Sequence, residues 1–419
     1  MVIIEDLELR KGMEEAYAKI KKDSGPVLVS QVQQIEEIDP LSFFAAGKAQ
    51  FSGERFYWKD NDSKKFFAGL GTCKEISAEG ETNRFFYVEN NWQRFIKNNI
   101  ILNSFQEQGI GPMIFGGFSF DPYKEKTNLW SKFSDGLFRV PKFLLTKANG
   151  KTYLSTNILF TRNDRPELAD NVIQERNELI KAASRCNVEL EDIQIAEKTE
   201  INPLKWKETV NELIKDLQKD KTLKKAVLAR ELRVKFNKEV SVETVIHHLL
   251  KQQKESYVFA FEVNGDCFLG ASPERLAKKE GNKVFSSCVA GSIGRGKTEE
   301  EDVKLGQTLL SDEKNLIEHQ YVVDMIQEAM EKVCKKIHLP EKPTLLKTRD
   351  IQHLYTPVTG EMEEGNSFFG LVERLHPTPA LGGLPKMEAV KKIRETEELD
   401  RGFYGAPLGW MDFAGNGEF

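Results

Sequence analysis

Cysteine is scarce in this chain, and its spacing suggests neither a disulfide framework nor a metal site. Five cysteines occur among 419 residues, and no two of them form a Cys-x-x-Cys pair. A disulfide-stapled fold and a zinc site are therefore not expected, and the prediction is reduced, packed cysteines in a cytoplasmic protein. The five are Cys73, Cys186, Cys267, Cys288 and Cys334.

Long apolar runs and a surplus of basic residues are missing as well. No stretch is apolar over the roughly 20 residues that a bilayer-spanning helix needs. The N-terminus has neither the basic start nor the apolar core of a signal peptide. The formal net charge is −5, with Lys and Arg interspersed among Asp and Glu, so the chain has no cationic excess for nucleic-acid phosphates. These absences argue against a membrane or a nucleic acid as partner.

The apolar pattern that is present predicts an antiparallel α+β protein. With 40% hydrophobic residues, the chain can bury a large core. Strands and helices alternate without a repeated βαβ unit. Strands are predicted at 50–58, 66–70 and 113–120, a hairpin at 142–159, helices at 91–107 and 165–191, and a linker between two halves at 189–202.

A lysine in the C-terminal half lies in a small apolar segment. In Lys-Ala-Val-Leu-Ala-Arg, residues 225–230, the strand period places Lys225 on one face with Val227 and Ala229. Removal from water favours the neutral form of a lysine, which is the form that a general base needs. The alternative is a lysine on a strand edge that pairs with a neighbouring acid.

A carboxylate occurs in a second apolar setting. Glu274 follows a Ser-Pro turn in Ala-Ser-Pro-Glu-Arg-Leu, residues 271–276, after a predicted hairpin at 257–269 with an Asn-Gly turn. Burial at such a place raises the pKa of a carboxyl group, which can then donate a proton. The alternative is that the Ser-Pro-Glu turn is only a turn.

A further carboxylate lies on a predicted helix at 311–336. Asp312 is a possible cap, and Glu318 falls in the apolar stripe that contains Val322. Because an unpaired buried charge is costly, Glu318 needs a partner. Pairing with Lys314, one turn earlier, is one explanation, and a metal ligand is the other.

With these segments, the second half of the chain resembles the chorismate-utilising enzymes, which include isochorismate, salicylate, anthranilate and aminodeoxychorismate synthases. The likeness is greatest to isochorismate synthases of the menaquinone pathway. The motifs that carry it lie at 225–230, 271–276, 288–296, 311–319, 351–354 and 376–385, with looser likeness at 116–122 and 138–146. The resemblance implies a single domain over residues 1–419, with a loosely matching half at 1–200 and a catalytic half at 201–419. Its expected fold is that of anthranilate synthase component I, with two antiparallel sheets stacked in a core and helices outside.

The resemblance also implies roles for particular residues. Lys225 activates a water that adds at C2 of chorismate, Glu274 protonates the departing C4 hydroxyl, and Glu318 coordinates Mg²⁺. The residues placed against the substrate are Gly291, Ser292, His353, Ala380 and Tyr404. The cofactor expected on this basis is Mg²⁺, the partner is chorismate, and the assembly is a monomer or a homodimer.

Two positions favour one reaction within the family. Relatives that add ammonia often have glutamine where this chain has Lys225, and relatives that eliminate pyruvate tend to have threonine where it has Ala380. The expected activity is therefore isochorismate synthase, for menaquinone biosynthesis. The alternatives are a salicylate synthase, an isochorismate synthase of a siderophore pathway, and a non-catalytic binding protein of the same fold.

The last residues depart from the family pattern. Residues 402–413 are interpreted as one strand of a hairpin and the next residues, with Glu418, as its turn, so that no returning strand pairs with it. Relatives continue with a strand that bears an arginine, a glycine-rich loop and a helix whose acidic residues complete the Mg²⁺ site. The expectation is a chain that lacks its C-terminal end and, as it stands, binds Mg²⁺ and chorismate poorly.

Overall fold

The computed structural model describes residues 2–22, 25–80, 83–219 and 222–419. Its helices are α1 (Val2–Lys22), α2 (Pro40–Ala46), α3 (Lys48–Phe51), α4 (Arg84–Lys97), the 3-10 helix η1 (Asn128–Trp130), α5 (Leu168–Arg185), α6 (Pro203–Lys219), α7 (Val242–Gln252), α8 (Glu299–Ser311), α9 (Glu313–Glu331), α10 (Phe368–Leu375) and α11 (Lys386–Thr396). The strands of the first half are β1 (Val27–Ile35), β2 (Arg55–Lys59), β3 (Lys65–Ala78), β4 (Asn99–Leu102), β5 (Met113–Phe118), β6 (Gly136–Ala148), β7 (Lys151–Phe160) and β8 (Ile195–Glu200). Those of the second half are β9 (Lys225–Ala226), β10 (Leu232–Phe236), β11 (Tyr257–Val263), β12 (Asp266–Ser272), β13 (Lys278–Glu280), β14 (Lys283–Gly294), β15 (Cys334–His338), β16 (Thr344–Lys347), β17 (Ile351–Met362), β18 (Gly383–Leu384), β19 (Leu408–Asp412) and β20 (Gly417–Glu418).

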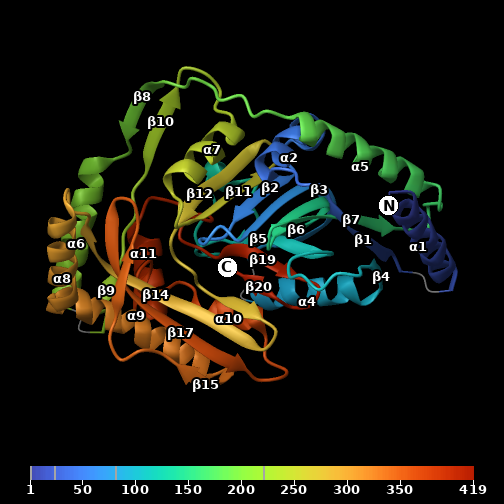
Figure 1. Ribbon diagram of the computed structural model, residues 1–419. Helices are drawn as coiled ribbons and strands as arrows, with labels where there is room; N and C mark the ends of the chain where they lie inside the picture. The colour runs from blue at the N-terminus through green and yellow to red at the C-terminus, as the bar shows by residue number, and fades with distance from the viewer. Residues whose placement is uncertain (1, 23–24, 81–82, 220–221) are drawn as a thin grey trace.

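The core is one hydrogen-bonded network of strands with helices outside, which confirms the α+β class. Sixteen strands form a sheet whose main path is β12-β11-β2-β3-β6-β5-β19-β20-β13-β14-β17-β15. Figure 1 shows the strands of the first half, in blue and cyan, beside those of the second half, in orange. The two expected sheets are thus joined, because the short β20 pairs with both β19 and β13.

This junction corrects two parts of the expectation for the last residues, the unpaired strand and the position of Glu418. β19 is paired on both sides, with β5 and with β20, so the returning strand is present. Glu418 lies in β20 and not in a turn, with 2% of its surface exposed, and accepts hydrogen bonds from Tyr257 Oη (2.6 Å) and Arg275 Nε (2.8 Å). The sequence did not indicate this strand because only two residues form it, and one of its two partners, β13, lies far away along the chain.

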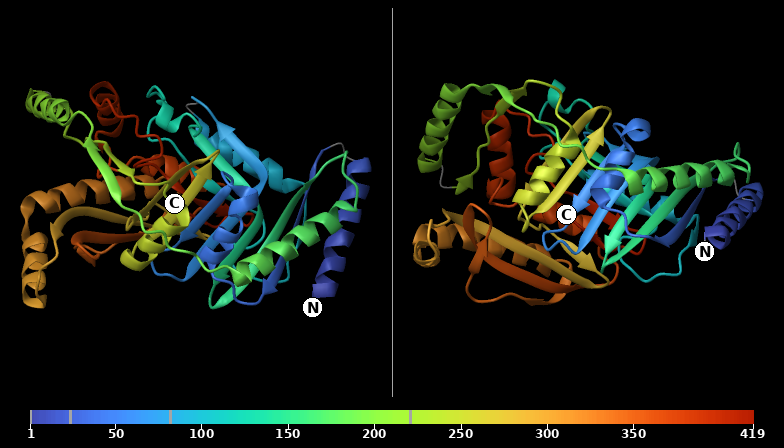
Figure 2. Two further views of the ribbon diagram at one scale, coloured as in Figure 1. Left: turned by 90° about the horizontal axis from the view of Figure 1, so that it is seen from above. Right: turned by 45° about the horizontal axis from the view of Figure 1, so that its top comes forward.

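Helices cover the network in two groups around two apolar clusters. α4, α9 and α10 pack on one cluster, which contains Phe118, Phe138 and Phe419. α1, α2, α5 and α7 pack against the other, which contains Phe43 and Phe143. Figure 2 shows α1 and α5 at one end of the molecule and α6 and α8 at the other. Within the described residues, the helices are all too short or too polar to cross a membrane.

Turn chemistry predicted the hairpins well. The hairpin at 142–159 is β6–β7 and that at 257–269 is β11–β12. Asn149 and Asn264, the first turn residues, have φ angles of 51° and 49°, as the tight Asn-Gly turn requires. These local signals needed no tertiary context.

Several element boundaries differ from the sequence prediction. The helix predicted at 91–107 is α4, which ends at Lys97, because the next residues form β4 in parallel pairing with β1. The strand predicted at 50–58 begins only at Arg55, after α3 and a turn at Gly53. In the predicted linker, β8 pairs with β10. The helix predicted at 311–336 is α9, which begins after Asp312 as expected but ends at Glu331, before β15.

Candidate active site

Lys225 lies in a two-residue strand, β9, that pairs with β18. The pairs are Lys225 with Leu384 and Ala226 with Gly383, so the strand predicted over 225–230 ends at Ala226. The prediction was too long because the backbone groups of the following residues bond to side chains instead of a sheet ladder. Lys225 Nζ donates to Glu318 Oε1 over 2.6 Å, and the lysine side chain is 18% exposed. The lysine is therefore largely buried and paired with an acid.

Glu318 lies in the second turn of α9, and its ion pair is with a lysine far away in the sequence. The predicted cap is confirmed, since Asp312 Oδ1 accepts from the backbone N–H of Asn315 over 2.8 Å. The Glu318 side chain is 35% exposed and its partner is Lys225, rather than the Lys314 that one interpretation of the sequence favoured. The long-range pairing brings two of the predicted site residues together.

Glu274 lies on the wall of a cavity of about 350 Å³ that apolar side chains dominate. Burial raises the pKa of its carboxyl group to about 7, against a smaller opposing effect of the Thr378 hydroxyl. The predicted shift in pKa is thereby confirmed, and a carboxyl with that pKa can hold a proton near neutral pH. The lining also includes Trp58, Tyr257, Phe259, Phe268, Leu269, His376, Leu381, Phe403, Tyr404 and Leu408.

One buried thiol shows that Lys225 and Glu274 face the same region. Cys288, in β14, is fully buried. Burial raises its thiol pKa most, the Glu274 carboxylate raises it further, and the Lys225 ammonium lowers it. Both charges therefore lie close enough to Cys288 to act on it through a poorly screened interior. The predicted acid and base, 49 residues apart in the sequence, thus both lie near one buried residue of the fold.

Gly291, Ser292 and His353 form one group where β14 pairs with β17. The pairing register shifts between Val289 and Ser292, and Gly291 has a φ of 82° at this bulge. A Cβ there would meet the side chains of Leu354 and Asn315 at 3.0 and 3.2 Å, so glycine is required on both grounds. Ser292 Oγ lies 2.7 Å from His353 Nδ1.

The close approach of the bulge to Asn315 has a consequence for the predicted site. Asn315 is one turn before Glu318 on α9, and its contact with Gly291 places this group beside Glu318. Burial lowers the pKa of His353, so its imidazole is neutral at physiological pH. A neutral ring beside Ser292 can donate or accept a hydrogen bond to a ligand.

Ala380 and Tyr404 lie on different surfaces. Ala380 packs, partly buried, against the apolar cluster that contains Phe118. Tyr404 is 54% exposed and lies on the edge of the cavity that holds Glu274. In the structure, Tyr404 and Glu274 therefore line the same cavity, and Glu318 forms an ion pair with Lys225.

His319 is a buried residue of the site for which sequence reasoning found no role. Its Nδ1 lies 2.9 Å from the Ala290 carbonyl, which can only accept, so Nδ1 carries the proton. Its Nε2 then accepts from Thr356 Oγ1 over 2.8 Å. Burial lowers the pKa of this imidazole, which is therefore neutral. The neutral ring connects α9 to β14 and β17, and its position next to Glu318 was the only sequence signal for it.

The described residues offer one carboxylate for the predicted metal. Within them, no group of three or more His, Cys, Asp or Glu side chains could hold an ion. Mg²⁺ in enzymes is bound by one or two carboxylates, with water and substrate oxygens as the other ligands. Glu318 fits that requirement in type and exposure, and its Oε1 atom is also the acceptor for Lys225.

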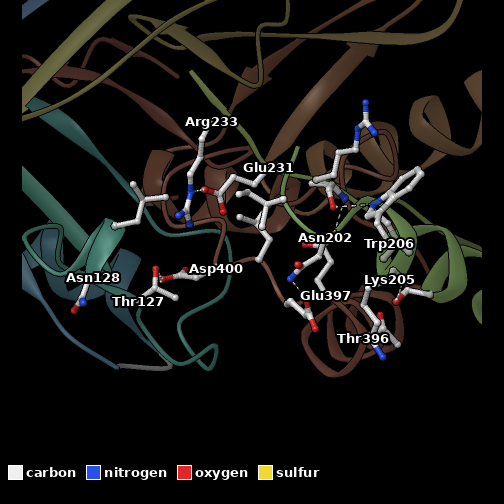
Figure 3. Close-up of a pocket in the computed structure, with 18 residues that line it drawn as sticks. Thr127, Asn128, Asn202, Lys205, Trp206, Glu231, Arg233, Thr396, Glu397 and Asp400 are labelled. Atoms are coloured by element: carbon white, nitrogen blue, oxygen red, sulfur yellow. Dashed lines mark hydrogen bonds and ion pairs between the residues drawn. The ribbon is translucent and has the colours of Figure 1, made fainter. Parts of the chain in front are cut away.

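A second cavity, of about 410 Å³, contains none of the predicted site residues. Figure 3 shows its walls: Lys205 and Trp206 come from α6, Thr396 from the end of α11, and Glu231 and Arg233 from the chain around β10. The segment 228–230, shortly after Lys225, also lines it. The segment that follows the predicted base therefore forms part of the wall of this cavity.

Comparison with known proteins gives a consistent result. The family model described as "Chorismate binding enzyme" matches residues 14–419. The isochorismate synthase MenF of Bacillus subtilis is 41% identical over 424 residues, which cover 100% of this chain and 89% of that protein. The salicylate biosynthesis isochorismate synthase of Pseudomonas aeruginosa is 31% identical over 98% of this chain and 84% of its own length.

A solved structure has the same fold. It is that of MenF, the menaquinone-specific isochorismate synthase from Escherichia coli, with a TM-score of 0.74 and 20% sequence identity. The alignment covers 97% of this chain and 88% of the other. At this level of identity the likeness concerns the arrangement of the chain, which agrees with the α+β architecture described above.

Proposed function

The chain belongs to the family of chorismate-binding enzymes, and we propose that it is an isochorismate synthase, an isomerase that converts chorismate to isochorismate. The observation that carries the proposal is that Lys225 and Glu274 both lie near one buried residue, Cys288. An acid and a base that face one region are what an exchange of hydroxyl groups requires. The full-length identity to an isochorismate synthase supports the same reaction.

Glu274 is the proposed acid. It protonates the hydroxyl that leaves C4 of chorismate, so that water departs rather than hydroxide. A pKa of about 7 suits this step, because half of the carboxyl groups hold their proton at neutral pH. Tyr404, on the edge of the same cavity, is proposed to hold a carboxylate of the substrate.

Lys225 is the proposed base. In its neutral form, it removes a proton from the water that adds at C2 while the ring double bonds shift and the C4–O bond breaks. One water is consumed and one is released, so the reaction is balanced. In the reverse direction the same two groups exchange their protonation states.

The substrate ring is proposed to lie near the β14 bulge and Glu318. Gly291 allows the ring a close approach, and Ser292 with His353 supplies hydrogen bonds. A bound Mg²⁺ would supply neutralisation of the ring carboxylate beside Glu318. Because Glu318 also accepts from Lys225, occupancy of the metal position and the orientation of the base are coupled through one carboxylate.

Ala380 supports a reaction that stops at isochorismate. Its small side chain is partly buried against the core, and the resemblance associates threonine there with the later loss of pyruvate. The proposal extends to menaquinone biosynthesis, to a cytoplasmic location and to a monomer or homodimer.

A product assay tests the proposal. The protein would be incubated with chorismate and Mg²⁺, and isochorismate, salicylate and pyruvate would be resolved, with Lys225→Ala and Glu274→Gln alongside. Isochorismate without pyruvate, and loss of turnover in both variants, is expected. Salicylate with pyruvate would instead indicate a salicylate synthase, and no conversion of chorismate would favour a non-catalytic protein.

A further inference from the structure

The segment that follows Lys225 leaves the strand ladder and is held by one backbone bond and by two side chains. Val227 N–H donates to the Gly382 carbonyl over 2.8 Å. The Val227 carbonyl accepts from Arg401 Nη2 over 2.7 Å, and Ala229 N–H donates to Glu397 Oε1 over 2.6 Å. These bonds satisfy backbone groups that a continuing strand would have paired.

Arg401 and Glu397 act together as a buried pair. Their side chains are 4% and 3% exposed. Arg401 Nε donates to Glu397 Oε2 over 2.8 Å, and Arg401 Nη2 donates to Glu397 Oε1. Figure 3 shows Glu397 among the residues that line the second cavity, behind this segment.

The same pair reaches the 376–385 motif. Arg401 Nη1 donates to the Leu381 carbonyl over 2.9 Å. The guanidinium also stacks 4.3 Å from the centre of the Phe120 ring, and the Phe120 carbonyl accepts from His376 Nε2 over 3.0 Å. One arginine thus contacts the segment of the proposed base and the loop that lines the cavity of the proposed acid.

We propose that Glu397 and Arg401 are positioning residues for the reaction, which fix the segment of Lys225 relative to the 376–385 loop. The proposal rests on the proposed role of Lys225. A buried ion pair contributes little net stability compared with apolar residues of similar volume. The planar guanidinium of Arg401, by contrast, holds the Val227 and Leu381 carbonyls at once through its fixed donors. The geometry therefore points to orientation of the base rather than to stability alone.

Arg401→Lys is the informative variant, because it retains the charge and the ion pair. A single ammonium cannot hold the Val227 and Leu381 carbonyls in the fork geometry of a guanidinium. We expect kcat to fall by about 10- to 100-fold, since small misplacements of a reacting group have effects of that size, with a smaller change in KM. Arg394→Lys is the matched control: Arg394 lies in α11, and its side chain makes a two-point contact with Asp121 rather than with the 225–231 segment. The turnover of this variant is expected to remain near that of the unmodified protein.

Two measurements separate orientation from general damage. In a Lys225→Ala background, Arg401→Lys should cause little further loss of activity, because the group that it orients is already absent. Amide hydrogen exchange of peptides within 225–231 should accelerate at least about 10-fold in Arg401→Lys and not in Arg394→Lys. An equal loss of activity with and without Lys225, or unchanged exchange in Arg401→Lys, would overturn the proposal.

The exchange measurement does not depend on the product. If the protein formed a different product from chorismate, or none, the proposed isochorismate synthase activity would fail while the effect of Arg401 on the segment was still measured. Slow exchange of the 225–231 peptides retained in Arg401→Lys would by itself contradict the proposed positioning role of Arg401, whatever the reaction.

Discussion

The two proposed catalytic groups are surrounded in opposite ways. Glu274 lies against a mostly apolar cavity, with a hydroxyl but no cation among the groups that determine its pKa. Lys225 forms an ion pair with a half-exposed glutamate and is followed by a segment that other side chains hold. Burial thus raises the pKa of the acid, whereas the ion pair and the held segment fix the position of the base. The acid should accordingly be sensitive to pH, and the base to geometry.

The largest effect is expected from Glu274→Gln, which removes the proton donor but keeps the shape of the side chain. Turnover should fall by about 10²- to 10⁴-fold. In the unmodified protein, the step that needs protonated Glu274 should weaken as the pH rises through about 7. The pH profile of kcat would show this decline, and the residual activity of the variant should lack it. A decline that persisted in the variant would assign it to another group.

The same substitution should increase stability in alkaline solution. The folded-state pKa of Glu274 is raised from 4.5 to about 7, so the folded protein binds more protons than the unfolded chain between these values and loses stability as the pH rises. Glu274→Gln should gain up to about 3 kcal/mol above pH 7 and nothing below about pH 4.5. Urea unfolding of the variant and of the unmodified protein, below pH 4.5 and above pH 7, would measure this difference in unfolding free energy.

On the side of the base, His319→Leu should cost about 2 to 4 kcal/mol in unfolding free energy. The substitution leaves the Ala290 carbonyl without its hydrogen bond and the Thr356 hydroxyl without its acceptor. Urea unfolding would measure the loss. His338→Leu, at an exposed position in β15, is the control and should remain within about 0.5 kcal/mol. Equal losses in the two variants would show that His319 has no special structural role.

Lys225→Met should change stability much less than activity. It removes the partner of Glu318, but that carboxylate is 35% exposed and water can solvate it, so the change should stay below about 1 kcal/mol. Urea unfolding and turnover would be measured on the same preparation. A loss above 3 kcal/mol would mean that the ion pair maintains the fold, which would remove the contrast with Glu274.

The smallest effect is expected from Ser292→Ala. Ser292 is exposed, so the loss of its contact with His353 should alter stability by less than about 0.5 kcal/mol. The KM for chorismate should nevertheless rise several-fold if the pair binds the substrate. An unchanged KM would remove Ser292 from the proposed binding residues.

Parts of the fold and site follow from local signals. Asn-Gly turns predicted two hairpins, and Asp312 predicted the start of α9. Burial of a carboxyl after an apolar hairpin predicted the shift at Glu274. The helix predicted at 91–107 was wrong beyond Lys97, because pairing of β4 with β1 overrides helical periodicity there. Contacts across the chain are invisible to a pattern that extends over a few residues.

The sequence by itself determined the identity of the chemical groups, the family resemblance that orders them and the turns that separate them, because each depends on residues close together in the chain. Only the tertiary structure decided that Glu318 pairs with Lys225 and not with Lys314, that Glu418 lies in a joining strand, and that Arg401 holds the segment of the base. Those outcomes depend on which backbone and charged groups remain unsatisfied after the strands pair, and folding must satisfy them with partners from anywhere in the chain.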